Sequence, residues 1–243
     1  MNLEFRKKII HLKTVNSTNE FAKKFINTYE DSDSFVITSD FQSSGKGQFN
    51  NSWESLSSKN LLISVVISLK KNIKTQFDLN IISSLAVIDV LNDLGFKNTS
   101  IKWPNDILVG SKKIAGILIE TKSKGNEIYK SIIGLGLNVN QEQFKIYDRE
   151  ATSLKIESNR LFDLIVIRDN FLKKLNDRFL IKMNTNYNDY NHSLYLLGKE
   201  STFIIGEKRI RGTIKEVGEN GDLKLCLEND IKSLKMKEIS YTI

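Results

Sequence analysis

The chain has 243 residues, of which 40% are hydrophobic and 27% are charged, and its formal net charge is +7. This composition excludes a disordered chain and allows one large domain, or one medium and one small domain. The single cysteine, Cys226, excludes an intrachain disulfide and a cysteine-cluster metal site. No apolar run reaches the roughly 18 residues of a transmembrane helix, and residues 1–10 lack a signal-peptide pattern, so we expect a cytoplasmic protein.

The N-terminal residues alternate between strand-like and helix-like patterns. Residues 5–15 predict a strand, and Ser17 followed by Glu20 three positions later predicts the start of a helix. Residues 35–38 predict a second strand, which leads into a polar loop at 40–53. Hydroxyl and amide side chains at a helix N-terminus can bind a polar ligand, although an ordinary helix cap is the better explanation of these residues on their own.

The loop at 40–53 carries a Gly45-Lys46-Gly47 string and ends at Trp53. Two glycines beside a lysine allow the backbone to approach a ligand while a cation contacts it. The loop matches neither a Walker A motif nor G-x-G-x-x-G, because Asn50 stands at the third glycine position. By itself the string is equally consistent with a flexible surface loop.

The middle of the chain predicts a sheet with one covering helix. The predicted elements are a strand at 61–69, a helix at 76–94 ending before Gly95, a strand at 99–103, and a hairpin of 113–121 and 127–139 with a turn that includes Asn126. Three glycines within that hairpin, Gly116, Gly134 and Gly136, indicate close approach of a ligand or of another backbone.

The string KWPND at 102–106 contains the only proline of the chain. Lys113 follows Asp106 by seven residues across a Gly110-Ser111 turn. A carboxylate, the carboxamide of Asn105 and a lysine brought together by a hairpin suit an anionic reactant. A plain strand-turn-strand with solvated polar ends accounts for these residues alone equally well.

The C-terminal part predicts a change of architecture. Residues 144–157 predict a loop, 159–183 a long amphipathic helix and 184–192 a domain boundary. Short strands are then predicted at 201–205, 208–217, 222–227, 232–235 and 238–242, with Asn220-Gly221 as a hairpin turn. This all-β module is small for an independent domain, so we expect it to pack on the larger one.

Five stretches, taken in order, resemble the motifs of the biotin protein ligase family. They are STN at 17–19, the loop at 42–53, KWPND at 102–106, KIAGILIE at 113–120 and GLGLN at 134–138. The related lipoate ligases and octanoyltransferases share the fold but not the KWPND and KIAGIL pair. The resemblance implies an α+β fold. A mixed β-sheet catalytic domain flanked by helices, of the class II synthetase-like or biotin–lipoate ligase type, would span residues 1–190, and a small SH3-like all-β domain would span 195–243.

The resemblance also implies a reaction in two steps. Biotin would attack the α-phosphate of ATP in the presence of Mg²⁺, giving biotinyl-5′-AMP, and a lysine of the biotin carboxyl-carrier protein of acetyl-CoA carboxylase would then attack the adenylate. No covalent enzyme intermediate is needed. This agrees with His11, His192 and Cys226, which match no catalytic motif.

Residue roles follow from the same resemblance. The catalytic residues would be Lys113, Asp106 and Lys46, and the metal ligands are not assigned. Biotin would be bound by Ser17, Thr18, Asn19, Gln42, Lys46, Gly47, Gln48, Lys113, Gly116, Leu118, Gly134 and Gly136. ATP would be bound by Gly45, Lys46, Trp53, Asn105 and Asn138. Within these sets, Ser17, Thr18 and Gln42 would bind the ureido ring. A narrow slot for the thiophane ring and acyl chain would be formed by Gly116, Leu118, Gly134 and Gly136.

Three alternatives accompany this hypothesis. Some members of the family are also DNA-binding repressors, but only 16 residues precede Ser17, so we expect a monofunctional ligase with no nucleic acid and no membrane as partner. A lipoate or octanoate transferase would have the same fold. A biotin-binding module without catalytic activity would fit the altered loop. Members of the family dimerise through different surfaces, so a homodimer is compatible with the resemblance.

The loop departs from the family pattern G-R-G-R-x-G-R-x-W. Lys46 replaces an arginine and cannot make its bidentate contacts, Gln48 and Asn51 remove two positive charges, and Asn50 replaces a glycine. Asparagine tolerates a positive φ better than most residues.

We therefore expect the Gln48→Arg variant to release the acyl-adenylate more slowly than the wild type, because a guanidinium adds hydrogen bonds to the phosphate. A rapid-filtration assay of the release rate tests this expectation. An unchanged release rate would contradict it.

Overall fold

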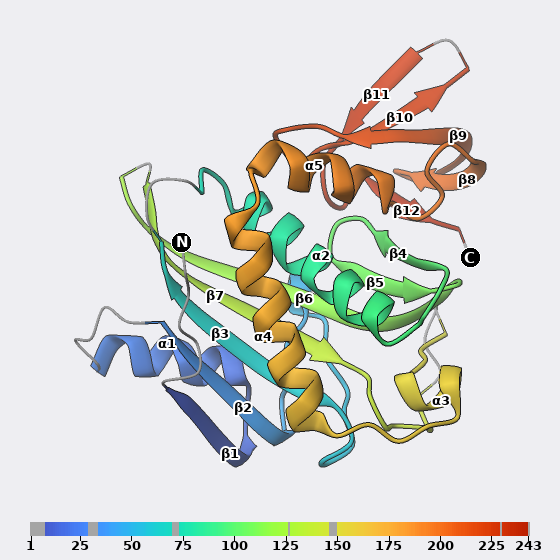
Figure 1. The fold of residues 1–243 in the computed structure, drawn as a ribbon. Coiled ribbons are helices and arrows are strands. Elements are labelled where there is room, and N and C mark those ends of the chain that lie inside the picture. Colours follow the sequence, from blue (N-terminus) through green and yellow to red (C-terminus); the bar gives the residue numbers. More distant parts are fainter. Residues whose placement is uncertain are drawn as a thin grey trace.

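The computed structural model describes residues 8–28, 34–69, 73–125, 127–145, 150–228 and 230–242. Helices pack on a large mixed sheet, and a second sheet lies at one end (Figure 1). The predicted α+β class is therefore confirmed. Residues 5–7 of the first predicted strand, Asn126 of the hairpin turn and residues 146–149 of the predicted loop lie outside the described residues.

The larger sheet has the strand order β1-β2-β3-β7-β6-β5-β4. Its strands are β1 (Ile9–Val15), β2 (Phe35–Gln42), β3 (Leu61–Ser68), β4 (Thr99–Lys102), β5 (Asp106–Val109), β6 (Lys112–Lys124) and β7 (Glu127–Leu137). The β1–β2 pair is parallel, and the other neighbours are antiparallel. The strands predicted at 35–38, 61–69 and 99–103, and the hairpin at 113–139, are confirmed to within a few residues.

The two faces of this sheet have different neighbours. Side chains alternate along β3, so Ile63 and Val65 join the main core under α2 (Gln76–Asp93). Val66 points the other way and packs with Ala22 of α1 (Thr18–Thr28). The helix α1 covers only part of that second face, and the uncovered part carries the cavity described below.

The helix α2 matches the predicted helix at 76–94. A capping box between Thr75 and Asp78 defines its start, and Gly95 follows its end with φ of +86°. Its apolar residues are buried nearly all around because the helix lies between the sheet on one side and α4 (Leu164–Leu180) and α5 (Met183–His192) on the other (Figure 1).

Three predictions for residues 144–192 were wrong in part. The predicted loop contains the short helix α3 (Leu154–Ser158), which begins where the Ser153 hydroxyl accepts the N–H of Ile156. The predicted helix at 159–183 starts later, as α4, because the Asp163 carboxylate caps it at Ile165. The predicted boundary at 184–192 is the helix α5. Its polar composition concealed a buried face that includes Asn186 and Tyr190.

The second sheet is antiparallel, with strand order β11-β10-β9-β8-β12, as expected of an SH3-like module. Its strands are β8 (Glu200–Ile205), β9 (Lys208–Val217), β10 (Leu223–Leu227), β11 (Asp230–Leu234) and β12 (Ile239–Tyr241). Gly221 forms the predicted hairpin turn between β9 and β10, with φ of +86°. The division into domains at 1–190 and 195–243 stays a prediction.

The two sheets share one hydrophobic core, which confirms that the C-terminal module packs on the larger sheet. The indole N–H of Trp103 donates to the carbonyl of Gly221 at 3.0 Å, and a Cβ built on Gly221 would lie 3.0 Å from Phe77. Among the residues that the structure describes, no helix combines the length and apolar character needed to cross a bilayer.

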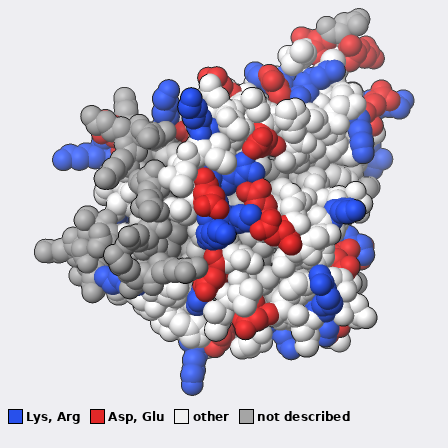
Figure 2. Space-filling view, viewed as in Figure 1, with Lys and Arg blue, Asp and Glu red and all other residues white. Residues whose placement is uncertain are grey.

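Acidic and basic side chains are interspersed on the face shown in Figure 2. Arg178 of α4 connects three helices. Its guanidinium donates to both carboxylate oxygens of Asp89 in α2 at 2.6 and 2.7 Å, and to Asp189 in α5 at 2.5 Å. These contacts, that with Asp89 first, raise the pKa of Arg178. The side chain is only 12% exposed, so the pairs are poorly screened by water.

We predict that Arg178→Met lowers the free energy of unfolding by about 3 kcal/mol, because two partly buried carboxylates lose their cation. Urea denaturation measures this change. Arg211→Met is the matched control, since its pair with Glu200 is exposed and worth about 0 to 1 kcal/mol. Equal losses in the two variants would contradict the prediction.

Candidate active site

A cavity of about 490 Å³ lies over the uncovered face of the larger sheet. Most of the residues predicted to bind substrate line it, namely Ser17, Thr18, Asn19, Gln42, Lys46, Gly47, Gln48, Trp53, Asn105, Asp106, Lys113, Gly116, Leu118, Gly134 and Gly136. Gly45 and Asn138 do not line it. The structure therefore brings together stretches that are more than 100 residues apart in the sequence.

The polar end of the cavity is built by the parallel pairing of β1 and β2. Val15 lies opposite Gln42, so the ends of the two strands, and the start of α1 that follows β1, meet at one edge. The side-chain oxygen of Gln42 accepts the backbone N–H of Thr18 at 2.8 Å, and the Thr18 hydroxyl lies 3.1 Å from the same oxygen. Thr18 and Gln42, predicted from separate motifs, are thus direct partners.

The floor of the cavity follows from the strand register. Gly116 of β6 lies opposite Gly136 of β7, and Gly134 lies opposite Ser64 of β3. Residues two apart on a strand share a face, and the three glycines all line the cavity.

Side chains of the protein occupy the space over the glycines. A Cβ built on Gly136 would lie 2.3 Å from the indole of Trp53, and one on Gly134 would lie 2.4 Å from Oδ1 of Asn19. A Cβ built on Gly116 would also lie close to Trp53, at 3.1 Å. In this structure the slot predicted for the ligand is therefore partly filled by Trp53 and Asn19, and a ligand in the slot would pack against them.

The cationic end is the predicted hairpin. The Nζ atom of Lys113 lies 2.7 Å from Oδ1 of Asp106, and Nζ of Lys102 lies 3.8 Å from the other oxygen. Lys113 also lies over the Trp53 ring, 5.6 Å from its centre. An ammonium and a carboxylate at one end of an apolar floor can bind anionic and cationic groups side by side.

The KWPND segment is held in place by two helices, α2 and α5. The Trp103–Pro104 peptide bond is cis. The Pro104 carbonyl accepts a hydrogen bond from Asn80 of α2 and another from the Tyr190 hydroxyl of α5 at 3.0 Å. Burial raises the pKa of Tyr190 well above its ordinary value, so this hydroxyl stays a donor. Helices on the far side of the sheet thus position the segment that bears Asp106.

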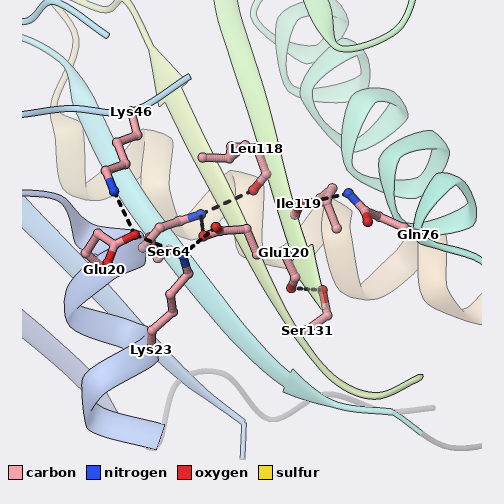
Figure 3. A network of polar contacts seen from close by, with 10 residues as sticks. Glu20, Lys23, Lys46, Ser64, Gln76, Leu118, Ile119, Glu120 and Ser131 are labelled. Carbon is pink, nitrogen blue, oxygen red and sulfur yellow. Dashed lines mark hydrogen bonds and ion pairs between the residues drawn. The ribbon is translucent and has the colours of Figure 1, made fainter. Parts of the chain in front are cut away.

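Lys46 points toward α1 in this structure, not toward Lys113. Its ammonium donates to the Glu20 carboxylate at 2.9 Å, and Lys23 donates to the same oxygen at 2.9 Å (Figure 3). The hydrogen bond from Lys23 and then the one from Lys46 lower the pKa of Glu20 to about 2. Glu20 therefore stays ionised at any pH near neutrality and holds the loop lysine.

Two predicted ATP-binding asparagines have structural partners. The Asn105 amide donates to the Ile117 carbonyl at 2.7 Å, which ties the segment before β5 to β6, although Asn105 still lines the cavity. Asn138 is buried and donates to the Thr152 carbonyl at 3.0 Å. Gly45 lies under Trp53, because a Cβ there would be 2.5 Å from the Trp53 carbonyl.

Sequence reasoning missed the contribution of the second sheet. Five residues around β12 line the cavity: Met236, Lys237, Ile239, Ser240 and Tyr241. The Lys237 ammonium lies over the ring of Phe49 in the loop, 4.2 Å from its centre. The loop residue with positive φ is Phe49, at 56°, and Lys237 also has a positive φ, of 75°. Nothing in the sequence around Phe49 or around Lys237 indicated this contact.

Among the described residues that line the cavity, Asp106 is the one carboxylate that could bind a metal directly. Within the described residues, no group of three or more His, Cys, Asp or Glu side chains could hold a metal ion. Asp106 is the carboxylate of the cavity and it is already paired with lysines. A Mg²⁺ ion there would take most of its ligands from water and from a nucleotide.

The comparison with known proteins agrees with this geometry. The family model for the biotin/lipoate A/B protein ligase family matches residues 12–138, more than half of the chain. The chain belongs to this family. The match includes every cavity-lining stretch of the larger sheet and excludes the second sheet.

Relatives in the family differ in how much of their length is matched. The bifunctional ligase/repressor BirA of Bacillus spizizenii is 29% identical over 158 residues, which cover 64% of this chain and 48% of that protein. BirA of Escherichia coli is 25% identical over 244 residues, 94% of this chain and 72% of that protein. The chain thus spans about half of the Bacillus relative.

A solved structure extends the likeness to the second sheet. The biotin protein ligase from Aquifex aeolicus, in complex with biotin and ATP, has a TM-score of 0.80 and 27% identity. The match covers 96% of this chain and 98% of that one. The biotin–[acetyl-CoA-carboxylase] ligase of Mycobacterium tuberculosis is 27% identical over 82% of this chain and 74% of that protein.

We predict that Gly136→Ala displaces the Trp53 indole from the floor, because the new methyl group would overlap the ring. The expected result is a shift in tryptophan emission and a loss of about 1 to 3 kcal/mol in stability. Gly47→Ala is the matched control, since its Cβ would have only ordinary contacts, at 3.4 Å and beyond. An unchanged emission spectrum in Gly136→Ala would contradict the placement of Trp53.

Proposed function

We propose that this protein is an ATP-dependent ligase that activates biotin as biotinyl-5′-AMP and transfers it to a lysine of a biotin carboxyl-carrier protein. The observation that carries the proposal is the order of groups along the cavity. Thr18 and Gln42 lie at one end, the glycine floor follows, and Lys113 with Asp106 lies at the other. From β3 to β5 there are three strand spacings, about 14 Å. This arrangement suits an elongated molecule with a neutral polar head and a carboxylate tail.

The first step joins two anions. The biotin carboxylate attacks the α-phosphorus of ATP, a new carbon-oxygen-phosphorus anhydride forms, and the bond to the β-phosphate breaks with release of pyrophosphate. Lys113 stands at the carboxylate end of the floor, where its ammonium would stabilise the added negative charge. Mg²⁺ would enter bound to the phosphates of ATP and neutralise part of their charge, with Asp106 as the nearby carboxylate.

The second step transfers the acyl group to the carrier. The neutral amine of a carrier lysine attacks the acyl carbon, an amide bond forms, and AMP leaves. Water must be excluded in the interval, because it would hydrolyse the anhydride. The loop at 43–53, with Trp53 on the floor and Phe49 against Lys237, lies where it would cover the adenylate.

The names of relatives support the choice of partner. A Mycobacterium tuberculosis relative and a Paracoccus denitrificans relative are both named biotin–[acetyl-CoA-carboxylase] ligase. The carrier subunit of acetyl-CoA carboxylase is therefore the acceptor to test first. The cytoplasm, a reducing compartment in keeping with the single cysteine, would be the place of reaction.

The test is mass spectrometry of the purified protein incubated with biotin, ATP and Mg²⁺, with and without a biotin carboxyl-carrier domain. We expect biotinyl-5′-AMP without the carrier and one added biotin on the carrier. Acylation of the carrier by lipoate or octanoate, with none by biotin, would instead support the related transferase. Biotin bound but never adenylated would contradict the ligase activity.

We predict that Lys113→Gln lowers the rate of adenylate formation by about 10² or more, because one charged donor is lost where negative charge develops. Lys112→Gln is the matched control, since the neighbouring ammonium pairs with the exposed Glu150 and lies outside the cavity lining. Pyrophosphate release measures both rates. Equal effects of the two variants would contradict the role of Lys113.

A further inference from the structure

A chain of polar groups, of which all but the first are buried, leads from the edge of α1 to the polar end of the cavity. Glu120 of β6 contacts Asn19, Asn19 contacts Ser64 of β3, and Ser64 contacts Thr18, which lines the cavity. Figure 3 shows Glu120 and Ser64 between α1 and the neighbouring strands. We name these four residues the Glu120 relay. Ser64 is fully buried, and Asn19 and Thr18 are less than 5% exposed.

The first link fixes the orientation of the Asn19 amide. One carboxylate oxygen of Glu120 lies 2.9 Å from Nδ2 of Asn19, and the Leu118 carbonyl lies 3.4 Å from the same nitrogen. A carboxylate and a carbonyl only accept hydrogen bonds, so both require the nitrogen to face them. The amide oxygen therefore faces Ser64. The other Glu120 oxygen accepts from Lys23 at 2.6 Å, which keeps the carboxylate beside α1.

The second link fixes the direction of the Ser64 hydroxyl. Its oxygen lies 2.5 Å from Oδ1 of Asn19 and 2.7 Å from Oγ1 of Thr18. A hydroxyl has one proton, and Oδ1 of Asn19 cannot donate. The Ser64 proton must therefore lie toward Asn19, since that contact would otherwise be between two bare oxygens.

The third link directs the Thr18 hydroxyl proton to Ser64. With the Ser64 proton directed to Asn19, the 2.7 Å contact between the two hydroxyls needs the proton of Thr18. The Gln42 oxygen, at 3.1 Å, is the more distant acceptor for this proton, and it already accepts the backbone N–H of Thr18 at 2.8 Å. The Thr18 hydroxyl then has no proton left for the cavity and presents a lone pair to it.

We propose that the Glu120 relay sets the hydrogen-bonding polarity of the cavity, making Thr18 an acceptor that selects a ligand N–H over a ligand oxygen. Glu120, Asn19 and Ser64 are then positioning residues that act through Thr18. This inference rests on the proposed function, in which the ligand at this end is the ureido ring with its two N–H groups. An oxygen in place of that N–H would face the Thr18 lone pair, so two acceptors would meet.

The experiment compares the binding of biotin with that of two cyclic carbamate analogues, in each of which one ring N–H is replaced by oxygen. For each analogue, isothermal titration calorimetry gives the ratio of the Kd of the analogue to the Kd of biotin. We expect the wild type to discriminate against one of the analogues by about 100-fold. For that analogue, Glu120→Met and Ser64→Ala should reduce the ratio at least tenfold, because Thr18 becomes free to rotate and donate.

Lys23→Met is the matched control. It removes the ion pairs of Glu120 and Glu20 with Lys23 but leaves the Glu120 acceptor of Asn19 in place. Its ratio should stay within threefold of the wild type. The ratio is insensitive to a general loss of affinity. Ser64→Ala removes only one buried atom, so this variant tests the relay even if Glu120→Met does not fold.

The outcomes separate the relay from the function. Wild-type protein that binds no biotin overturns the proposed function and the relay with it. Wild-type protein that binds biotin, with the same ratio in Ser64→Ala or in folded Glu120→Met as in the wild type, overturns the relay alone. A Lys23→Met ratio reduced as far as that of Ser64→Ala would also overturn it, since the ion pair and not the acceptor would then control Thr18.

Discussion

The cavity depends on glycines at facing positions of adjacent strands, where no side chain covers the backbone. Gly136 and Gly116 lie opposite each other, and Gly134 lies two residues before Gly136 on the same face. A slip of one residue in the β6–β7 register would turn this face away from the cavity. Trp53 and Asn19 can then lie directly on the floor, so the register places both the loop and the start of α1. The floor is a property of the sheet, and the functional side chains are arranged around it.

Three lysines of the cavity have carboxylate partners before any substrate enters. Lys113 and Lys102 share Asp106, while Lys46 is paired with Glu20, which does not line the cavity. The Lys46 pair is about half exposed on the lysine side, and pairs of this kind contribute little, so an anionic ligand can take over the lysine at small cost. The Asp106 pair is more enclosed, which keeps Lys113 in one place at the end of the floor. Lys46 can thus exchange its partner, whereas Lys113 stays with Asp106.

Local patterns revealed much of the larger sheet and the outline of the site. The seven-residue spacing from Asp106 to Lys113 across a turn predicted that a hairpin brings these two side chains together, and in the structure they lie 2.7 Å apart. Alternation and β-branching predicted the buried strands, because these signals lie within single elements. The helix α5 was missed, since its buried Tyr190 and Asn186 are too few to give an apolar pattern.

Contacts between distant segments left no such signal. Glu120 lies 101 residues after Asn19, and the strand pattern at 113–121 gave no indication of this partner. The strand register places Glu120 beside α1, where its partners Asn19 and Lys23 lie. The same holds for Met236 to Tyr241, since their place in the cavity depends on how the second sheet packs on Trp103 and Phe77. Packing between elements, and not propensity within them, decides these contacts.

The second sheet is a wall of the cavity and not an appended module. Phe49 and Lys237 both hold a left-handed backbone, which costs a residue other than glycine about 1 to 3 kcal/mol. Their cation–π contact is worth about 0.5 to 1 kcal/mol where exposed, so it cannot by itself offset the strain at both positions. The rest of the loop and the turn before β12 must therefore impose the two conformations. The loop at 43–53 has fewer arginines than the family pattern, and the Lys237 ammonium lies beside Phe49 in this loop. The loop and the second sheet thus form one surface over the floor.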